Sequence, residues 1–155
     1  MTPRAIFFDM DDTLLDTSGG VAESWRATCA AFAGDLGCDA EALNTAIRRQ
    51  MLEFWKDEAA VEPWRTRLHD ARAHNIGVAL TANQLDASHA QRLSDRYWDE
   101  QSNRMKLFDD AFETLDLLRA EGYRLALLTN GPAEMQRWKL GRFPIAERFD
   151  VVVIE

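Results

Sequence analysis

Three carboxylates stand within four positions near the start of the sequence: Asp9, Asp11 and Asp12. They directly follow a short apolar run at residues 5–8, which is typical of a parallel strand buried on both faces, as are the later runs at residues 123–129 and 151–154. Crowded acidic groups at a strand end repel one another and lose hydration on burial. One aspartate could cap the following turn, but three indicate a bound cation or substrate. A hard cation such as Mg²⁺ would offset the repulsion through one or two carboxylates.

Two neighbouring carboxylates can share the work of phosphoryl transfer. One can attack phosphorus and form an acyl phosphate, which divides hydrolysis into two steps. The other can protonate the leaving oxygen and then deprotonate the attacking water, a contribution of about 10²–10⁴ in rate. The acidic run therefore predicts a phosphoryl-transfer site.

A second polar turn, Thr129-Asn130-Gly131-Pro132, follows an apolar run at residues 123–129. Ligands of open α/β sheets bind outside the carboxyl ends of the strands, and Asp9 and Thr129 both fall at such ends. The Thr129 hydroxyl and the N–H groups of the turn could hold phosphate oxygens. A Thr-Asn-Gly turn alone is common, so its significance depends on its position opposite Asp9.

The elements around these residues alternate between strand and helix. A third β-branched run covers residues 151–154, and helices are expected over 111–121 and 133–140. Gly122 is a natural terminator for the first of these helices. This order predicts the α/β class, with a Rossmann-like parallel sheet and right-handed crossovers.

The long segment between the first two strands predicts helices only. Four apolar stripes at helical spacing support this interpretation. They are Val21, Trp25, Cys29 and Phe32; Leu43, Ile47, Met51 and Phe54, with Asp39 as N-cap; Trp64 and Leu68, after a start at Pro63; and Leu85, His89, Leu93 and Tyr97. We therefore expect a core of residues 1–16 and 106–155, with an all-helical module at 17–105.

The bulk properties limit the partners. With 46% hydrophobic residues, 28% charged residues and a net charge of −8, the chain has a globular composition and little attraction for nucleic acid or anionic lipid. It carries no membrane-length apolar run and no signal-peptide pattern at its N-terminus, so we expect a cytoplasmic protein. Cys29 and Cys38 are interpreted as free thiols, although a disulfide between them stays open.

The segment Ile6-Phe7-Phe8-Asp9-Met10-Asp11-Asp12-Thr13-Leu14 resembles motif I of the haloacid dehalogenase-like (HAD) superfamily, and residues 125–131 look like its motif II. The helical module resembles the C1 cap of that family, which closes over the site and selects substrate. The resemblance implies that Asp9 is the nucleophile, Asp11 the general acid and base, and Thr129 a phosphoryl ligand beside Asn130 and Gly131. It also implies Mg²⁺ bound by the Asp9 carboxylate and the Asp11 backbone carbonyl.

The residue at position 11 narrows the reaction. Family members that displace halide from carbon usually carry Tyr there and need no Mg²⁺, so Asp11 favours a phosphatase of a small phosphorylated metabolite over a 2-haloacid dehalogenase. Phosphomutases of the superfamily share the Asp pair and stay open as an alternative.

Two of the four family motifs, a lysine after the third strand and an acidic pair after the fourth, have no counterpart before Glu155. We therefore expect a truncated or partly recorded copy of a longer enzyme, whose first strand would be an exposed edge prone to self-association. A catalytically incomplete module that binds phosphate or a partner is the alternative. Lys139 precedes the third strand and is interpreted as a solvated helix residue rather than the missing lysine.

Overall fold

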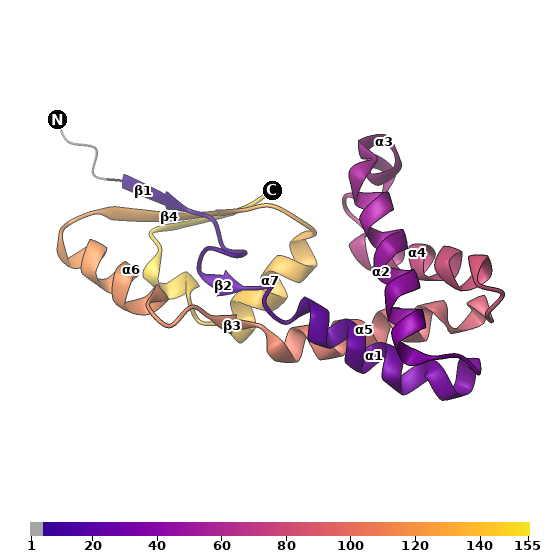
Figure 1. Ribbon diagram of the computed structural model, residues 1–155. Helices are drawn as coiled ribbons and strands as arrows, with labels where there is room; N and C mark the ends of the chain where they lie inside the picture. The colour runs from indigo at the N-terminus through magenta and orange to yellow at the C-terminus, as the bar shows by residue number, and fades with distance from the viewer. Residues whose placement is uncertain (1–4) are drawn as a thin grey trace. The chain divides into compact units, whose positions relative to one another are not determined.

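The computed structural model describes residues 5–155. A three-stranded parallel sheet forms the centre of one of its two compact units. The strands are β1 (Ala5–Phe8), β4 (Arg124–Thr129) and β5 (Val151–Ile154), in the order β1-β4-β5 (Figure 1). Phe8 of β1 stands in register with Leu127 of β4. The structure thus confirms the predicted α/β class.

Two helices cover one face of this sheet, α6 (Ala111–Ala120) and α7 (Ala133–Arg142) (Figure 1). Leu125, Leu127 and Thr129 point into this side and are buried, whereas the alternate residue Leu128 is 39% exposed. The alternation follows from the two-residue period of a strand. A 3₁₀ turn at Ala146–Arg148 leads into β5.

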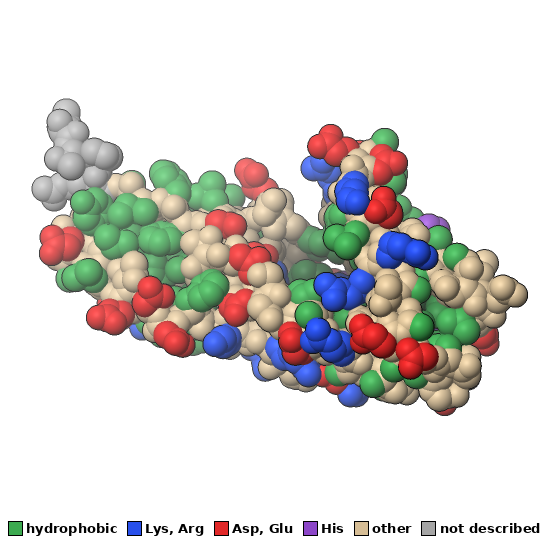
Figure 2. All heavy atoms as spheres, in the orientation of Figure 1, with side chains coloured by type: hydrophobic (Ala, Val, Ile, Leu, Met, Phe, Trp, Pro, Cys, Tyr) green, Lys and Arg blue, Asp and Glu red, His purple; other side chains and the backbone are tan. Residues whose placement is uncertain are grey.

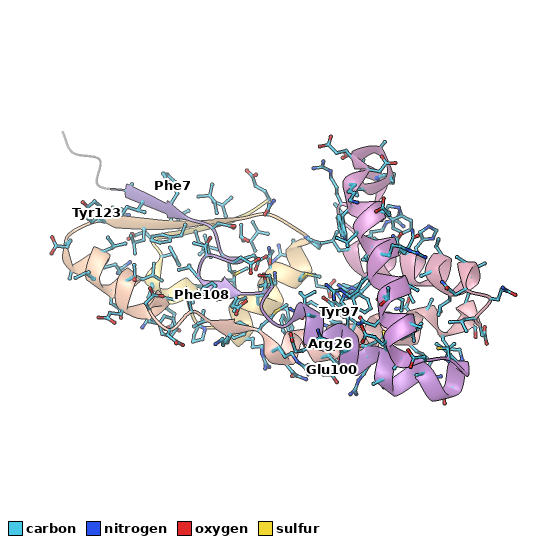
Figure 3. All side chains as sticks on the ribbon, in the orientation of Figure 1. Phe7, Arg26, Tyr97, Glu100, Phe108 and Tyr123 are labelled. Carbon is cyan, nitrogen blue, oxygen red and sulfur yellow. The ribbon has the colours of Figure 1, made fainter. Side chains whose placement is uncertain are left out.

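The opposite face of the sheet is apolar and open in the described residues. Phe7 is 68% exposed and lies on the side of β1 that faces away from α6 (Figure 3). Val151 is 51% exposed on β5, and hydrophobic side chains gather on the visible surface over this sheet (Figure 2). The expectation that these strands are buried on both faces is therefore wrong for residues 5–155. Self-association through the β1 edge stays a prediction.

A second, two-stranded antiparallel sheet joins β2 (Leu15–Asp16) to β3 (Lys106–Leu107). The sequence analysis did not predict it, because two residues are too few to establish a strand period. Leu15 is fully buried, and the Phe108 N–H donates to the Leu14 carbonyl at 3.0 Å. This sheet ties together the two chain segments that flank the helical region.

The chain divides into two units at these flanks. One unit runs up to Ser18 and continues from Met105, and the other is Gly19–Arg104, all helical (Figure 1). From the sequence, we expect the division at residues 16/17 and 105/106.

The helical unit begins with α1 (Val21–Leu36) and α2 (Ala40–Lys56). Gly37 ends α1 with φ of 63°, a left-handed conformation that glycine adopts without a Cβ penalty. The Asp39 side chain accepts from the Ala42 N–H at 2.8 Å, which confirms the predicted N-cap. The core is made by residues from all four long helices: Trp25, Cys29, Phe32, Leu43, Ile47, Ile76, Ala79, Leu80, Leu93 and Tyr97.

The later helices differ from the prediction. A short α3 (Glu58–Val61) is followed by a 3₁₀ turn at Glu62–Trp64 that contains Pro63. The third long helix, α4 (Leu68–Ala82), starts only at Leu68. The prediction of a helix starting at Pro63 is therefore wrong. The fourth, α5 (Ala90–Arg104), follows a 3₁₀ turn at Ala87–His89.

The two cysteines are free thiols with different surroundings. Burial, with smaller contributions from Cys38 and Glu41, raises the pKa of Cys29 to about 12. The thiolate is the reactive form, so Cys29 stays protonated and unreactive at neutral pH. We expect iodoacetamide to label the native protein at Cys38 only, and to label Cys29 after denaturation in urea, as peptide mass spectrometry would measure. Rapid labelling of Cys29 in the native protein would contradict this.

None of the helices in residues 5–155 combines the length and the apolar character that crossing a membrane requires.

Candidate active site

Asp9 follows β1 directly and is exposed. One carboxylate oxygen, Oδ1, accepts from the Met10 N–H at 2.8 Å, which fixes the side chain beside its own backbone. Asp9 lines an open hollow of about 290 Å³ together with Leu128, Thr129, Asn130 and Glu155. The structure thus brings Asp9 and the polar turn after β4 to one place, because neighbouring parallel strands end at the same sheet edge.

Thr129 ends β4 and is 3% exposed. Its hydroxyl accepts from the Gln136 side-chain amide at 3.0 Å, and the same amide donates to the Asn130 carbonyl at 2.5 Å. A hydroxyl that accepts one hydrogen bond keeps its own proton to donate to a ligand oxygen. Thr129 is therefore held in place without losing its donor.

Gly131 shapes the turn. Its φ of 125° is a conformation that other residues rarely adopt, and an added Cβ would lie 3.3 Å from Nε2 of Gln136. The Gly131 N–H donates to the Glu155 carbonyl at 3.0 Å. Because its N–H is already used, Gly131 contributes to the site by letting the backbone pass close to the Gln136 side chain, not by donating a free N–H to a ligand.

The prediction that Lys139 is a solvated helix residue is wrong. It is 4% exposed, and its Nζ lies 2.8 and 2.6 Å from the two carboxylate oxygens of Asp11. Asp11 Oδ2 also lies 3.2 Å from Nε2 of Gln136, so Gln136 connects Asp11 to Thr129. A buried ammonium needs such a partner, because an unpaired charge is costly to bury.

Asp12 has a different role from its neighbours. Its φ of 54° turns the backbone, and Oδ1 accepts from the N–H groups of Thr17 and Ser18 and from the Thr17 hydroxyl at 2.9–3.0 Å. Partial burial opposes ionisation of Asp12, but these hydrogen bonds outweigh it and lower the pKa. Asp12 is a turn cap, so only Asp9 and Asp11 are candidates for the chemistry.

The donor set at the end of β1 fits Mg²⁺ in part. Within residues 5–155, the Asp11 carbonyl has no hydrogen-bond partner and Oδ1 of Asp9 accepts only from the Met10 N–H, so both could bind a cation while the second Asp9 oxygen stays open for attack. The Asp11 carboxylate is engaged by Lys139 instead. In the described chain no group of three or more acidic, histidine or cysteine side chains could hold a metal. Mg²⁺ commonly binds through one or two protein oxygens and keeps several waters, which this pair allows.

Sequence reasoning missed Gln136 and the role of Lys139. Both stand on α7, three residues apart, and so lie on one helix face. An amide and a lysine at this spacing, just after a polar turn, are the signal that could have indicated a face turned to the site.

Comparisons with known proteins place this geometry in a family. The model of the haloacid dehalogenase-like hydrolases matches residues 3–155. N-acylneuraminate-9-phosphatase of Mus musculus is 29% identical over 154 residues, 97% of this chain and 60% of the relative. (S)-2-haloacid dehalogenase 1 of a Pseudomonas species is 30% identical over 153 residues, 95% of this chain and 60% of the relative.

Solved structures agree on the fold. The HAD-hydrolase YfnB from Bacillus subtilis matches with a TM-score of 0.65 at 21% identity, over 98% of this chain and 63% of that one. The chain thus spans about 60% of the length of the curated relatives it matches. On the family match over residues 3–155, the chain belongs to the haloacid dehalogenase-like hydrolases.

Proposed function

We propose that this chain is a phosphatase that hydrolyses the phosphate ester of a small metabolite through a phosphoaspartate at Asp9. The observation that carries the proposal is a pair of carboxylates with different surroundings at the end of β1. Asp9 is exposed in a hollow shared with Thr129, whereas Asp11 is held by Lys139 and Gln136. The first suits a nucleophile and the second a positioned acid and base.

The two steps balance with these residues. The open Asp9 oxygen attacks phosphorus, and the bond to the ester oxygen breaks. That oxygen takes up, through Asp11, the proton that Asp11 and Lys139 share between them. The alcohol leaves and an acyl phosphate remains on Asp9. Asp11 then takes a proton from water as the water oxygen attacks phosphorus. The bond from phosphorus to Asp9 breaks, which yields inorganic phosphate and restores both carboxyl groups.

The turn after β4 would bind the transferred group. Thr129 keeps its hydroxyl proton for a phosphoryl oxygen, and Asn130 is exposed in the same hollow. Gly131 lets the backbone approach closely, and the N-terminus of α7 follows at Ala133. Mg²⁺, held by Asp9 and the Asp11 carbonyl, would supply positive charge to the phosphoryl oxygens.

The relatives include phosphatases and dehalogenases at similar identity, so identity alone does not choose the reaction. Asp11 favours phosphate ester hydrolysis over halide displacement. A halide leaves carbon without being protonated, whereas an ester oxygen leaves phosphorus more easily when an acid protonates it. A second carboxyl group therefore has a task in ester hydrolysis that halide displacement does not offer. The net charge of −8 also favours a small substrate over nucleic acid or an anionic membrane.

The test is hydrolysis of p-nitrophenyl phosphate by the 155-residue protein. We expect release of inorganic phosphate with Mg²⁺, loss of activity in EDTA and recovery when Mg²⁺ is restored. No halide should be released from 2-chloropropionate.

Three other outcomes would contradict the proposal. Phosphate binding without turnover would fit a non-catalytic phosphate-binding module. Halide release would fit a dehalogenase, and transfer of the phosphoryl group to a second hydroxyl, with no free phosphate, would fit a phosphomutase.

A further inference from the structure

The helical unit contains a cavity of about 310 Å³ that side chains of α1, α2, α4 and α5 line. This volume lies in the range of small-molecule sites. Trp25, Trp55 and Tyr97 supply aromatic surface, and Arg48 and Arg72 are the only charged side chains of the described residues that line it. The cavity thus combines an apolar wall with positive charge.

Two buried aromatic rings line the cavity. Trp25 and Tyr97 are stacked, with ring centroids 4.0 Å apart and an interplanar angle of 23°, and both are buried. The Arg72 guanidinium lies over the Tyr97 ring at 4.8 Å from its centroid. Tyr97 is labelled in Figure 3, where it lies among the side chains of the helical unit. A guanidinium stacked on a fixed ring is held in one orientation, so its donors are preorganised.

The positive charge of the cavity is not neutralised by the protein. In residues 5–155 no carboxylate forms an ion pair with Arg48 or Arg72, and Nη1 of Arg72 lies 3.5 Å from Nδ1 of His69. Burial lowers the pKa of Arg72, opposed by Tyr97 and by Asp95 at longer range. Asp95 itself accepts from Gln91 at 2.8 Å. An anion in the cavity would therefore supply a missing partner.

The rim is apolar. Leu52 is 60% exposed and Trp55 is 47% exposed, and both lie on α2 beside Arg48. Large apolar side chains left in water at the mouth of a cavity favour a ligand with an apolar body. The two arginines therefore favour a negatively charged group at one end of the ligand, and the apolar rim favours a hydrophobic group at the other end.

We infer that this cavity binds a small organic oxyanion, with a carboxylate or phosphate-like group on Arg48 and Arg72 and an apolar body against the tryptophans. A guanidinium fork matches the two oxygens of either group. The site is built by side chains of the helical unit alone, and binding there does not depend on the chemistry proposed for Asp9.

Isothermal titration calorimetry on the 155-residue protein tests this with three probes of similar size. They are 3-phenylpropionate, 2-phenylethylphosphonate and the neutral 3-phenylpropan-1-ol. We expect at least one oxyanion to bind about 10- to 100-fold more tightly than the alcohol, because charge-assisted hydrogen bonds carry the difference. The stronger of the two oxyanions identifies the charged group that the site prefers.

The variants Arg48→Met and Arg72→Met should each remove most of this preference. Arg49→Met, the next residue on α2 and not part of this cavity, is the matched control and should bind as the wild type does. Arg48 is exposed, so its replacement tests the site even if Arg72→Met unfolds, which circular dichroism would reveal. Equal binding of the alcohol and the oxyanions, no binding, or full oxyanion binding by Arg48→Met would each overturn the inference.

Discussion

Replacing Asp9 by Asn is expected to reduce the rate of phosphate ester hydrolysis by about 10³-fold or more. The amide has the shape of the carboxylate but lacks the negative oxygen that attacks phosphorus, so no acyl phosphate can form. Asp9 is exposed and its side chain accepts a hydrogen bond from the N–H of its neighbour Met10, which the Asn side chain can also accept, so the fold should survive. Initial rates with p-nitrophenyl phosphate, measured beside circular dichroism spectra, check this result.

Asp109→Asn is the matched control for this variant. It makes the same change of charge at an exposed position of the same unit and should leave the rate within about twofold of the wild type. If Asp9→Asn keeps wild-type turnover, another group must accept the phosphoryl group, and the role of Asp9 is wrong.

The second large effect concerns the Asp11–Lys139 pair. The side chain of Lys139 is 5% exposed and that of Asp11 is 31% exposed. Asp11→Ala leaves a buried ammonium without a partner and should reduce the free energy of unfolding by roughly 3 kcal/mol. Lys139→Met leaves a carboxylate that water can reach and that Gln136 still contacts, so the loss should be about 1 kcal/mol. Asp11→Ala is therefore expected to lose more unfolding free energy than Lys139→Met.

Urea unfolding of both variants and of the double variant measures the coupling. Removing both charges avoids the unpaired ammonium, so the double variant should be more stable than the sum of the two losses predicts, by about 1–3 kcal/mol. Simple additivity, or a larger loss for Lys139→Met, would contradict a buried ion pair at this position.

Much of the fold could be predicted from the sequence because its signals are local. The β4 and β5 runs lie within a residue of their predicted bounds, and the predicted stripes of α1 and α2 lie inside helices that extend up to four residues beyond them. Elements too short to repeat, such as β2 and β3, gave no signal. Pro63 is acceptable at the first turn of a helix, yet here it sits in a 3₁₀ turn that precedes α4.

The candidate site also contains residues whose positions could be predicted from the sequence and residues whose positions could not. Asp9 and Thr129 could be predicted to meet, because each directly follows a parallel strand. The burial of Lys139 could not, since it depends on Asp11, 128 positions away in the sequence. The difference between Asp11 and Asp12 also arises only in three dimensions, where the left-handed backbone at Asp12 directs its carboxylate to Thr17.

The most direct test of the account is to find the phosphoryl group on Asp9 during turnover. Acid quenching of the protein with an isotopically labelled phosphate ester, followed by peptide mapping, would locate it. We expect the label on the peptide that contains Asp9, sensitive to hydroxylamine as an acyl phosphate is, and absent from Asp9→Asn. Turnover without label on this peptide, or with label on another residue, would contradict the central claim.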